Sequence, residues 1–163
     1  MEITEPDFYR LASEVARQSK TGRFAAKSPA LLLPSEQLGE HREIYYGSLL
    51  HRLKNQKSRT QYLFSLPHLR SELNKLPKAD AEKVLNWWEL LLSYKNLEIR
   101  FTEDSFNSCI IGDNHILTKE GTKRFLLSPD FSKSADIIRH FDSHFKKASV
   151  KHKDMIKELR KSL

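Results

Sequence analysis

The sequence YKNLEIRFTEDSFNSCIIGDNHILTKEG, residues 94–121, is the only part of the chain in which several strand signals follow one another closely. Apolar residues at positions 97, 99 and 101 alternate with Glu98 and Arg100, as they do in a half-buried strand. A short apolar run at 109–111 ends at the turn sequence Gly-Asp-Asn, and residues 115–118 then resume an extended pattern. This stretch therefore predicts a strand followed by a β-hairpin.

Helix and strand patterns alternate through the rest of the chain. Residues 5–19, 36–54 and 78–94 carry apolar positions three and four apart, which predicts amphipathic helices, with a shorter helix at 68–75. Residues 60–66 and 124–127 are rich in β-branched, aromatic and leucine side chains and predict two more strands. We therefore expect an α/β fold, in which helices flank a mixed central sheet and helix 5–19 packs on the domain.

The composition favours one domain. The 163 residues, 39% of them hydrophobic, can bury a single core but are few for two. No apolar run approaches the ~18 residues of a membrane helix, and the opening MEITEPDFYRL lacks the order of a secretory signal. We therefore expect a cytoplasmic protein without a membrane span. Cys109 lies in an apolar strand and is expected to be a buried free thiol rather than a reactive one.

The C-terminal region continues a helical stripe. No Pro or Gly occurs after Pro129, and apolar positions recur three and four apart from Ile138 to Leu159, close to a heptad repeat. This predicts a long C-terminal helix. The helix would begin inside a domain of residues 1–148 and continue as a basic helical extension, residues 149–163.

That extension carries most of the net charge. The chain has 28 Lys and Arg against 21 Asp and Glu, a formal charge of +7, yet the segment from Lys146 onward holds seven basic and two acidic residues. A concentrated basic helix favours DNA or RNA as a partner, although a solvated coiled-coil arm has the same composition. The residues predicted to contact nucleic acid are Lys146, Lys147, Lys151, Lys153, Lys157, Arg160 and Lys161.

The central stretch resembles the core of a phospholipase D-like domain. Active members of that family carry His-x-Lys followed by four residues and Asp, and counting back from Asp113 places Ser108 at the Lys position and Phe106 at the His position. The helix EIYYGSLLHRL, the strand RTQYLFSL, the Trp-containing helix and the aromatic-rich HFDSHFKKA follow the same element order. The resemblance covers residues 28–148 and rests on element order more than on identities.

The resemblance implies a degenerate, single-lobed module. Catalysis in this family needs an imidazole that attacks phosphorus and an ammonium that holds the phosphate oxygens, and Phe106 and Ser108 supply neither. Catalytically incomplete members serve as regulatory or nucleic-acid-associated modules, and single lobes often pair about a two-fold axis. The resemblance therefore implies a non-catalytic binding or regulatory function and a homodimer.

Two other functions stay open. One is a phosphodiesterase or nuclease whose site is assembled across a dimer from His115, Asp113 and Lys119. The other is a protein-interaction module that uses the C-terminal helix.

Several polar groups invite a site interpretation. Asp136, His140 and His144 are spaced four apart on one helix face, as zinc-binding histidines can be, but HExxH and a further Cys are absent. Surface histidines are favoured, and no metal or cofactor is expected. Acidic and imidazole groups between positions 103 and 115 could gather at the ends of the central strands, where open sheets bind ligands. They are Glu103, Asp104, Asp113 and His115. The turn carrying Lys54, Lys57 and Arg59 is read as solvated rather than as a phosphate site.

Overall fold

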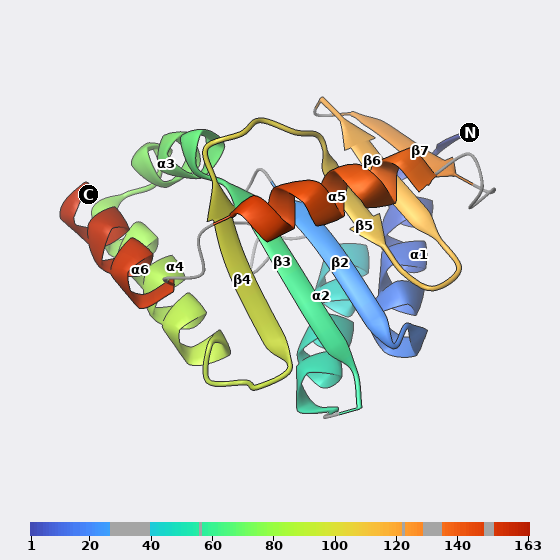
Figure 1. The fold of residues 1–163 in the computed structure, drawn as a ribbon, viewed down its shortest axis with the longest axis horizontal. Helices are drawn as coiled ribbons and strands as arrows, with labels where there is room; N and C mark the ends of the chain where they lie inside the picture. The colour runs from blue at the N-terminus through green and yellow to red at the C-terminus, as the bar shows by residue number, and fades with distance from the viewer. Residues whose placement is uncertain (27–39, 56, 122, 129–134, 149–151) are drawn as a thin grey trace.

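Figure 1 shows the computed structural model, which describes residues 1–26, 40–55, 57–121, 123–128, 135–148 and 152–163. Strands and helices follow one another in the order β1 (Glu2–Ile3), α1 (Glu5–Gln18), β2 (Thr21–Ala26), α2 (Glu40–Lys54), β3 (Arg59–Ser65), α3 (Leu66–Lys75), α4 (Lys78–Leu91), β4 (Leu97–Thr102), β5 (Ser108–Ile111), β6 (Ile116–Glu120), β7 (Arg124–Ser128), α5 (Ala135–Lys147) and α6 (His152–Lys161). The expected α/β class is confirmed.

The strands described form one mixed sheet in the order β1-β7-β6-β5-β2-β3-β4. Strands β2, β3 and β4 are parallel, whereas β5 runs antiparallel to β2 and continues through β6 and β7 as an antiparallel meander. The predicted hairpin of residues 109–118 is the β5–β6 pair. The pairing of neighbouring strands therefore changes once from parallel to antiparallel, at the β2–β5 boundary.

Helices cover the two faces of the sheet unequally. Side chains of α1, α2, α3, α4 and α6 share one core cluster with the strand residues that point to the same side. Aromatic rings stack in a row within it: Phe24 lies 5.1 Å from Tyr62, which lies 5.2 Å from Phe64, which lies 4.9 Å from Trp88. The other face is covered, in the part of the chain that the structure describes, by α5 alone (Figure 1).

Helix α5 is fixed to its face by polar contacts as well as by burial. Phe141 and Phe145 are buried, the Arg23 Nε atom lies 3.0 Å from Asp142 Oδ1, and Arg100 donates a 2.8 Å hydrogen bond to the carbonyl of Phe145. The Arg100 guanidinium also lies 4.3 Å from the centre of the Phe145 ring. These contacts explain why β2 and β4 carry the charged residues Arg23 and Arg100 on the sheet face that α5 covers.

The predicted long C-terminal helix is wrong. The structure has two helices, because α5 ends at Lys147 and α6 begins at His152. Ile156 and Leu159 of α6 are 1% and 2% exposed and belong to the main core cluster. The heptad-like stripe thus marks a helix that docks on its own domain next to α4, a case that spacing alone does not distinguish from pairing with another chain.

Two strands were not predicted. β2, with the sequence TGRFAA, contains one large apolar residue and a glycine, so its pattern is weak, yet it lies between β3 and β5 in the sheet. A Cβ on Gly22 would lie 2.7 Å from Phe24 Cε2 and 3.1 Å from Arg52 Nη2, so the close approach of Arg52 requires glycine there. β1 is only two residues long and pairs with β7.

Candidate functional site

We call the border of the sheet at which its strands begin or end an edge. One such edge brings together the ends of strands from the parallel and the antiparallel half. β3 and β4 end there, and β5 begins there, because β5 runs opposite to the parallel strands. Open α/β sheets bind ligands outside the carboxyl ends of parallel strands where the strand order changes. Residues 103–107, which link β4 to β5, cross this edge.

This linking segment is held from two sides. On the α3 side, His68 Nε2 lies 3.0 Å from Ser105 Oγ and Arg70 lies 3.3 Å from Glu103. On the α5 side, His144 Nδ1 lies 2.8 Å from Asp104 Oδ2. The Ser65 hydroxyl, at the end of β3, donates a 2.8 Å hydrogen bond to the Asp104 carbonyl. The segment is therefore positioned by α3, β3 and α5.

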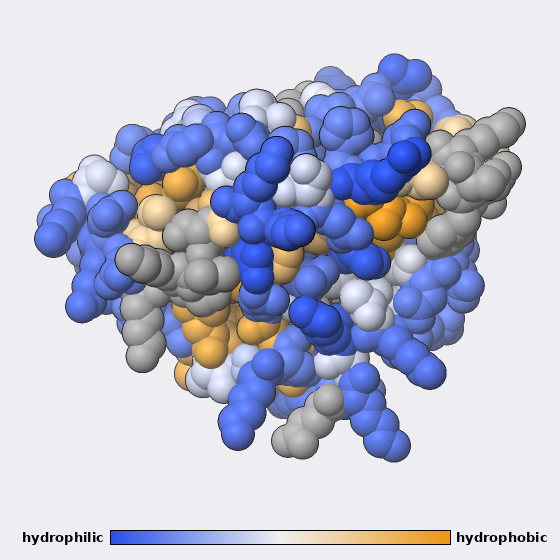
Figure 2. Space-filling view, viewed as in Figure 1, coloured by the Kyte–Doolittle hydropathy of each residue, from blue (hydrophilic) through white to orange (hydrophobic). Residues whose placement is uncertain are grey.

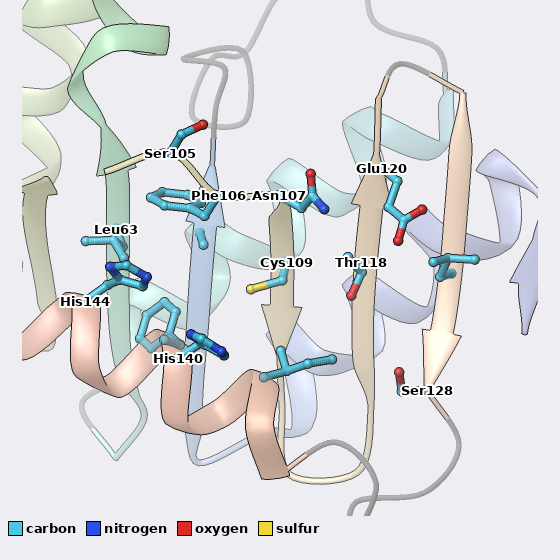
Figure 3. Close-up of a pocket in the computed structure, with 14 residues that line it drawn as sticks. Leu63, Ser105, Phe106, Asn107, Cys109, Thr118, Glu120, Ser128, His140 and His144 are labelled. Carbon is cyan, nitrogen blue, oxygen red and sulfur yellow. The ribbon is translucent and has the colours of Figure 1, made fainter. Parts of the chain in front are cut away.

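A pocket of about 520 Å³ lies between this segment, α5 and the front of the sheet (Figure 3). Its floor is apolar, with Ala25, Leu63 and Cys109 in adjacent strands. Around it stand Phe106 and Asn107 of the linking segment and the rings of α5, whose lining residues are Ile137, His140, Phe141 and His144. Its size and mixed lining are those of a small-molecule site.

The polar groups at this pocket form two incomplete catalytic arrangements. Asp104 orients His144, as an acid orients a general base, but the neighbouring hydroxyl of Ser105 is bonded to His68 instead. A nucleophilic triad needs its hydroxyl and carboxylate on the same imidazole. Burial raises the pKa of Cys109 to about 12, so the thiol in the pocket floor is protonated at neutral pH.

The predicted histidine pair lies at this pocket without a third ligand. The rings of His140 and His144 are stacked 6.3 Å apart, and Asp136 is bonded to Arg139. Within the residues that the structure describes, no three His, Cys, Asp or Glu side chains form a group that could hold a metal ion. Sequence reasoning missed His68, Ser105 and the Asp104–His144 contact, although His68, Asp104 and Ser105 each follow the end of a strand.

The three positions aligned with the phospholipase D motif do not converge. Phe106 lines the pocket and Ser108 begins β5, whereas Asp113 follows the far end of that strand. There the Asp113 carboxylate accepts a 2.8 Å hydrogen bond from the backbone N–H of Lys20, and its own N–H donates to Ser19 Oγ at 3.0 Å. Asp113 therefore ties the β5–β6 turn to the end of α1.

The alternative catalytic residues are also separated within one chain. His115 lies 3.7 Å from Glu14 of α1, and the Lys119 ammonium lies 5.5 Å from the centre of the Phe125 ring. The two residues are four positions apart along extended chain, or about 14 Å at ~3.4 Å per residue. The expected gathering of acidic and imidazole groups is likewise divided, since Asp104 and Asp113 lie at opposite edges of the sheet.

The predicted nucleic-acid residues are mostly exposed. Among the described side chains, Lys146, Lys147, Lys157 and Lys161 are exposed and make no ion pair. Arg160 lies 3.0 Å from Glu89 and 2.6 Å from Asn86, which holds α6 on α4. Lys151 and the Lys153 side chain lie outside the described residues.

Comparisons with known proteins bear on the fold. No protein-family model and no curated protein sequence matches the chain. The structure is similar to that of TrmBL2, an archaeal chromatin protein with a novel mode of DNA binding, with a TM-score of 0.56 and 13% sequence identity. The match covers 92% of this chain and 53% of that chain, so this chain spans about half of that protein. At this identity the similarity concerns the fold, and the phospholipase D-like assignment stays a prediction.

Proposed function

We propose that this chain is a non-catalytic binding module that associates with nucleic acid and serves a regulatory role in the cytoplasm. The observation that carries the proposal is the surplus of exposed lysines without a carboxylate partner in the described residues, within a chain of net charge +7. Such a surplus attracts phosphate backbones and releases their counterions. The similarity in fold to a DNA-binding chromatin protein supports this direction.

The non-catalytic part of the proposal has its own support. Phe106 occupies the position of the nucleophilic histidine in the phospholipase D-like motif, and the polar groups of the pocket form two incomplete catalytic arrangements. On this scaffold, phosphate groups would be bound by charge and not cleaved. A module of this kind is expected to pair with a second copy, and sedimentation equilibrium would then give twice the 19.1 kDa mass of the chain.

Binding to labelled nucleic acid tests the function. Fluorescence anisotropy of a 20-base-pair DNA duplex, and of a single-stranded RNA of equal length, would be followed at 50 and 200 mM NaCl. We expect binding whose affinity falls steeply with salt, since each phosphate contact contributes a slope of ~0.7–0.9 in log K against log salt. Absence of binding at 50 mM salt, or binding indifferent to salt, would refute the proposal.

The rival enzyme is a nuclease with a dimer-assembled site of His115, Asp113 and Lys119. Hydrolysis of bis(4-nitrophenyl) phosphate by the wild-type chain and by His115→Ala separates the two. A binding module shows no turnover in either protein, whereas turnover that His115→Ala abolishes in a folded chain would establish the enzyme. The protein-interaction alternative is less favoured, because the apolar face of α6 is occupied by its own domain.

No helix in the described parts of the chain is both long enough and apolar enough to cross a membrane.

A further inference from the structure

The edge of the sheet opposite the pocket gathers cationic side chains from distant parts of the sequence. Because β2, β3 and β4 are parallel, the residues that precede them lie side by side: the N–H of Arg59 donates to the Lys20 carbonyl at 2.8 Å, and the N–H of Thr60 donates to the Asn96 carbonyl at 2.8 Å. The ends of α1 and α2 reach the same edge. We call it the lysine edge, and its exposed cations are Arg17, Lys20, Lys54, Lys57, Arg59 and Lys95.

The charge of the lysine edge is largely unneutralised. Lys20, Lys54, Lys57 and Lys95 make no ion pair within the residues described. Of the carboxylates that contact this edge, Glu98 lies 3.9 Å from Arg59 but 2.6 Å from Arg100, and Asp113 is bonded to backbone. In Figure 2, hydrophilic side chains project from the lower edge of the molecule, where these three strands begin in Figure 1.

A buried cation lies beneath the edge. Arg52 is 2% exposed and bonds to the hydroxyl of Thr60 and to the carbonyls of Ala16, Ser19, Lys20 and Arg59. None of these hydrogen-bond partners is a carboxylate, so within hydrogen-bonding distance its positive charge meets only dipoles, and the Asp113 carboxylate acts on it from farther away. Burial lowers the pKa of Arg52, with Asp113 acting the other way, but a guanidinium stays charged at neutral pH. It therefore adds to the positive potential outside.

The surface of the edge is hollowed. One hollow, of about 110 Å³, is lined by Arg17, Lys20, His51 and Lys57 among others. A second, of about 680 Å³, is lined by Lys54, Lys95, Tyr94 and Asn96 with two neighbours. Asn55 and Asn96 meet nearby, since Asn96 Nδ2 donates to the Asn55 carbonyl at 3.0 Å. Cationic groups therefore surround concave surface rather than project singly.

Helix capping does not account for Lys20 at the end of α1. Basic residues near a helix C-terminus often serve only to satisfy its last carbonyls and its dipole. At the end of α1 that role is already filled by Arg52, which binds the Ala16 and Ser19 carbonyls. Lys20 is consequently free for a partner in solution, whereas Lys54 lies in the last turn of α2 and Lys57 follows that helix.

We infer that the lysine edge is the surface that contacts the sugar-phosphate backbone of double-stranded DNA, an inference that rests on the proposed function. Lysine ammonium groups bind phosphates as point charges. Single-stranded nucleic acid is usually held by stacking on exposed aromatic rings. Among Phe, Tyr and Trp, the described ring in these hollows is Tyr94, which packs against the core. At ~4.8 Å between strands the edge spans roughly 10 Å, or about three phosphates of one DNA strand.

Two variants with the same change of charge test the inference. The edge variant is K20Q/K54Q/K57Q/K95Q. The control, K146Q/K147Q/K157Q/K161Q on α5 and α6, removes four lysines of the rival site that the sequence alone predicts. Affinity for a labelled 20-base-pair duplex is measured from 50 to 200 mM NaCl. We expect the edge variant to lose at least tenfold in affinity at 50 mM and to lower the salt slope by about 3, while the control loses less than threefold.

The outcomes separate this inference from the function on which it rests. No duplex binding by the wild-type chain would defeat the proposed function. Duplex binding that the control variant loses and the edge variant keeps would overturn only the assignment of DNA contact to the lysine edge. Edge-dependent binding that is tighter to single-stranded RNA, or to vesicles of phosphatidylserine and phosphatidylcholine, would overturn the assignment to duplex DNA.

A measurement on the wild-type chain avoids any folding defect of the variants. Lysine acetylation with and without the duplex, read by mass spectrometry, reports which ammonium groups DNA covers. Protection of at least threefold at Lys20, Lys54, Lys57 and Lys95 would support the inference. Protection confined to lysines outside the edge would refute it.

Discussion

Arg52 joins more elements than any sequence pattern indicates. From the last turn of α2 it reaches the end of α1 and the starts of β2 and β3. Its partners are mostly backbone carbonyls, which would be left without donors in a buried place if the guanidinium were removed. Arg52 thus stabilises the same edge whose exposed lysines we assign to DNA.

Arg52→Met is expected to lower the free energy of unfolding by at least about 3 kcal/mol, since it leaves several buried carbonyls unpaired. Urea denaturation followed by circular dichroism measures this. Arg59→Met is the control, because its side chain is 67% exposed, and its cost should stay below about 0.5 kcal/mol. A loss under 1 kcal/mol for Arg52→Met would show that water replaces the guanidinium.

Gly112 is required by packing at the turn after β5. A Cβ there would lie 2.5 Å from Ser19 Oγ and 2.7 Å from Val15 Cγ1. Gly112→Ala should therefore lower the free energy of unfolding by about 1–3 kcal/mol. Gly47→Ala is the matched control. A Cβ at Gly47 would meet no other described atom within 4 Å beyond its own helix backbone, and in the exposed interior of α2 the change should gain about 0.5–1 kcal/mol. Equal effects of the two changes on the urea midpoint would contradict this account.

Cys109 should make the free energy of unfolding fall as the pH rises above about 9. Burial raises its pKa from 9.0 to about 12, so the folded chain keeps a proton that the unfolded chain loses. The stabilisation is complete below pH 9 and declines as pH rises toward 12, by up to about 1.4 kcal/mol per pH unit.

Urea denaturation of wild type and Cys109→Ala at pH 8 to 10.5 isolates this effect. The buried Tyr45 and Tyr62, whose pKa values are also raised by burial, are common to both proteins. The difference in stability between the proteins should shrink as pH rises. A difference that stays constant would mean that the thiolate is accommodated in the fold.

At the scale of elements, α6 behaves as a part of the domain core. Ile156→Ala should lower the free energy of unfolding by about 2–5 kcal/mol, because it leaves a cavity in the cluster that joins α6 to α4. Lys157→Ala, on the exposed side of the same helix, should change it by less than about 0.5 kcal/mol. If α6 were a free arm, the two variants would unfold at the same urea concentration.

The elements that the sequence predicts well are those with a strong local period. Leu97, Ile99 and Phe101 alternate with partly exposed residues in β4 as expected. β2 was missed because it is central and four of its six residues are small, so its position depends on β3 and β5 rather than on its own pattern.

The candidate site was less predictable than the fold. Asp104 and His144 are 40 residues apart, and His68 lies 37 residues before Ser105. No periodicity reports such contacts, which arise because parallel strands end at one edge and α5 returns across it. The spacing of His140 and His144 was visible in the sequence, but its meaning depended on what α5 packs against.

In the whole molecule, the pocket and the group of exposed cations lie at opposite edges of one sheet. The edge at the ends of β3 and β4 carries a pocket with imidazoles and an apolar floor, whereas the edge at the starts of β2, β3 and β4 carries cations. In the part of the chain that the structure describes, seven cationic side chains, Arg52 included, stand at that second edge against the two carboxylates Glu98 and Asp113. Polyanion binding at one edge would leave the pocket at the other accessible.

Concentrated charge of one sign should also make the free chain sensitive to salt. Two ammonium groups 10 Å apart in water repel by about 0.4 kcal/mol, and 0.15 M salt, with a screening length of ~8 Å, removes most of that repulsion. Raising NaCl from 10 to 150 mM should therefore increase the free energy of unfolding by about 1 kcal/mol.

In K20Q/K54Q/K57Q/K95Q this salt effect should fall to less than half, because the repelling charges are gone. Urea denaturation at both salt concentrations, without any nucleic acid, measures it in the wild-type chain, this variant and K146Q/K147Q/K157Q/K161Q. A wild-type stability that falls with salt, or a salt effect that only the second variant removes, would place the uncompensated charge elsewhere than at the lysine edge.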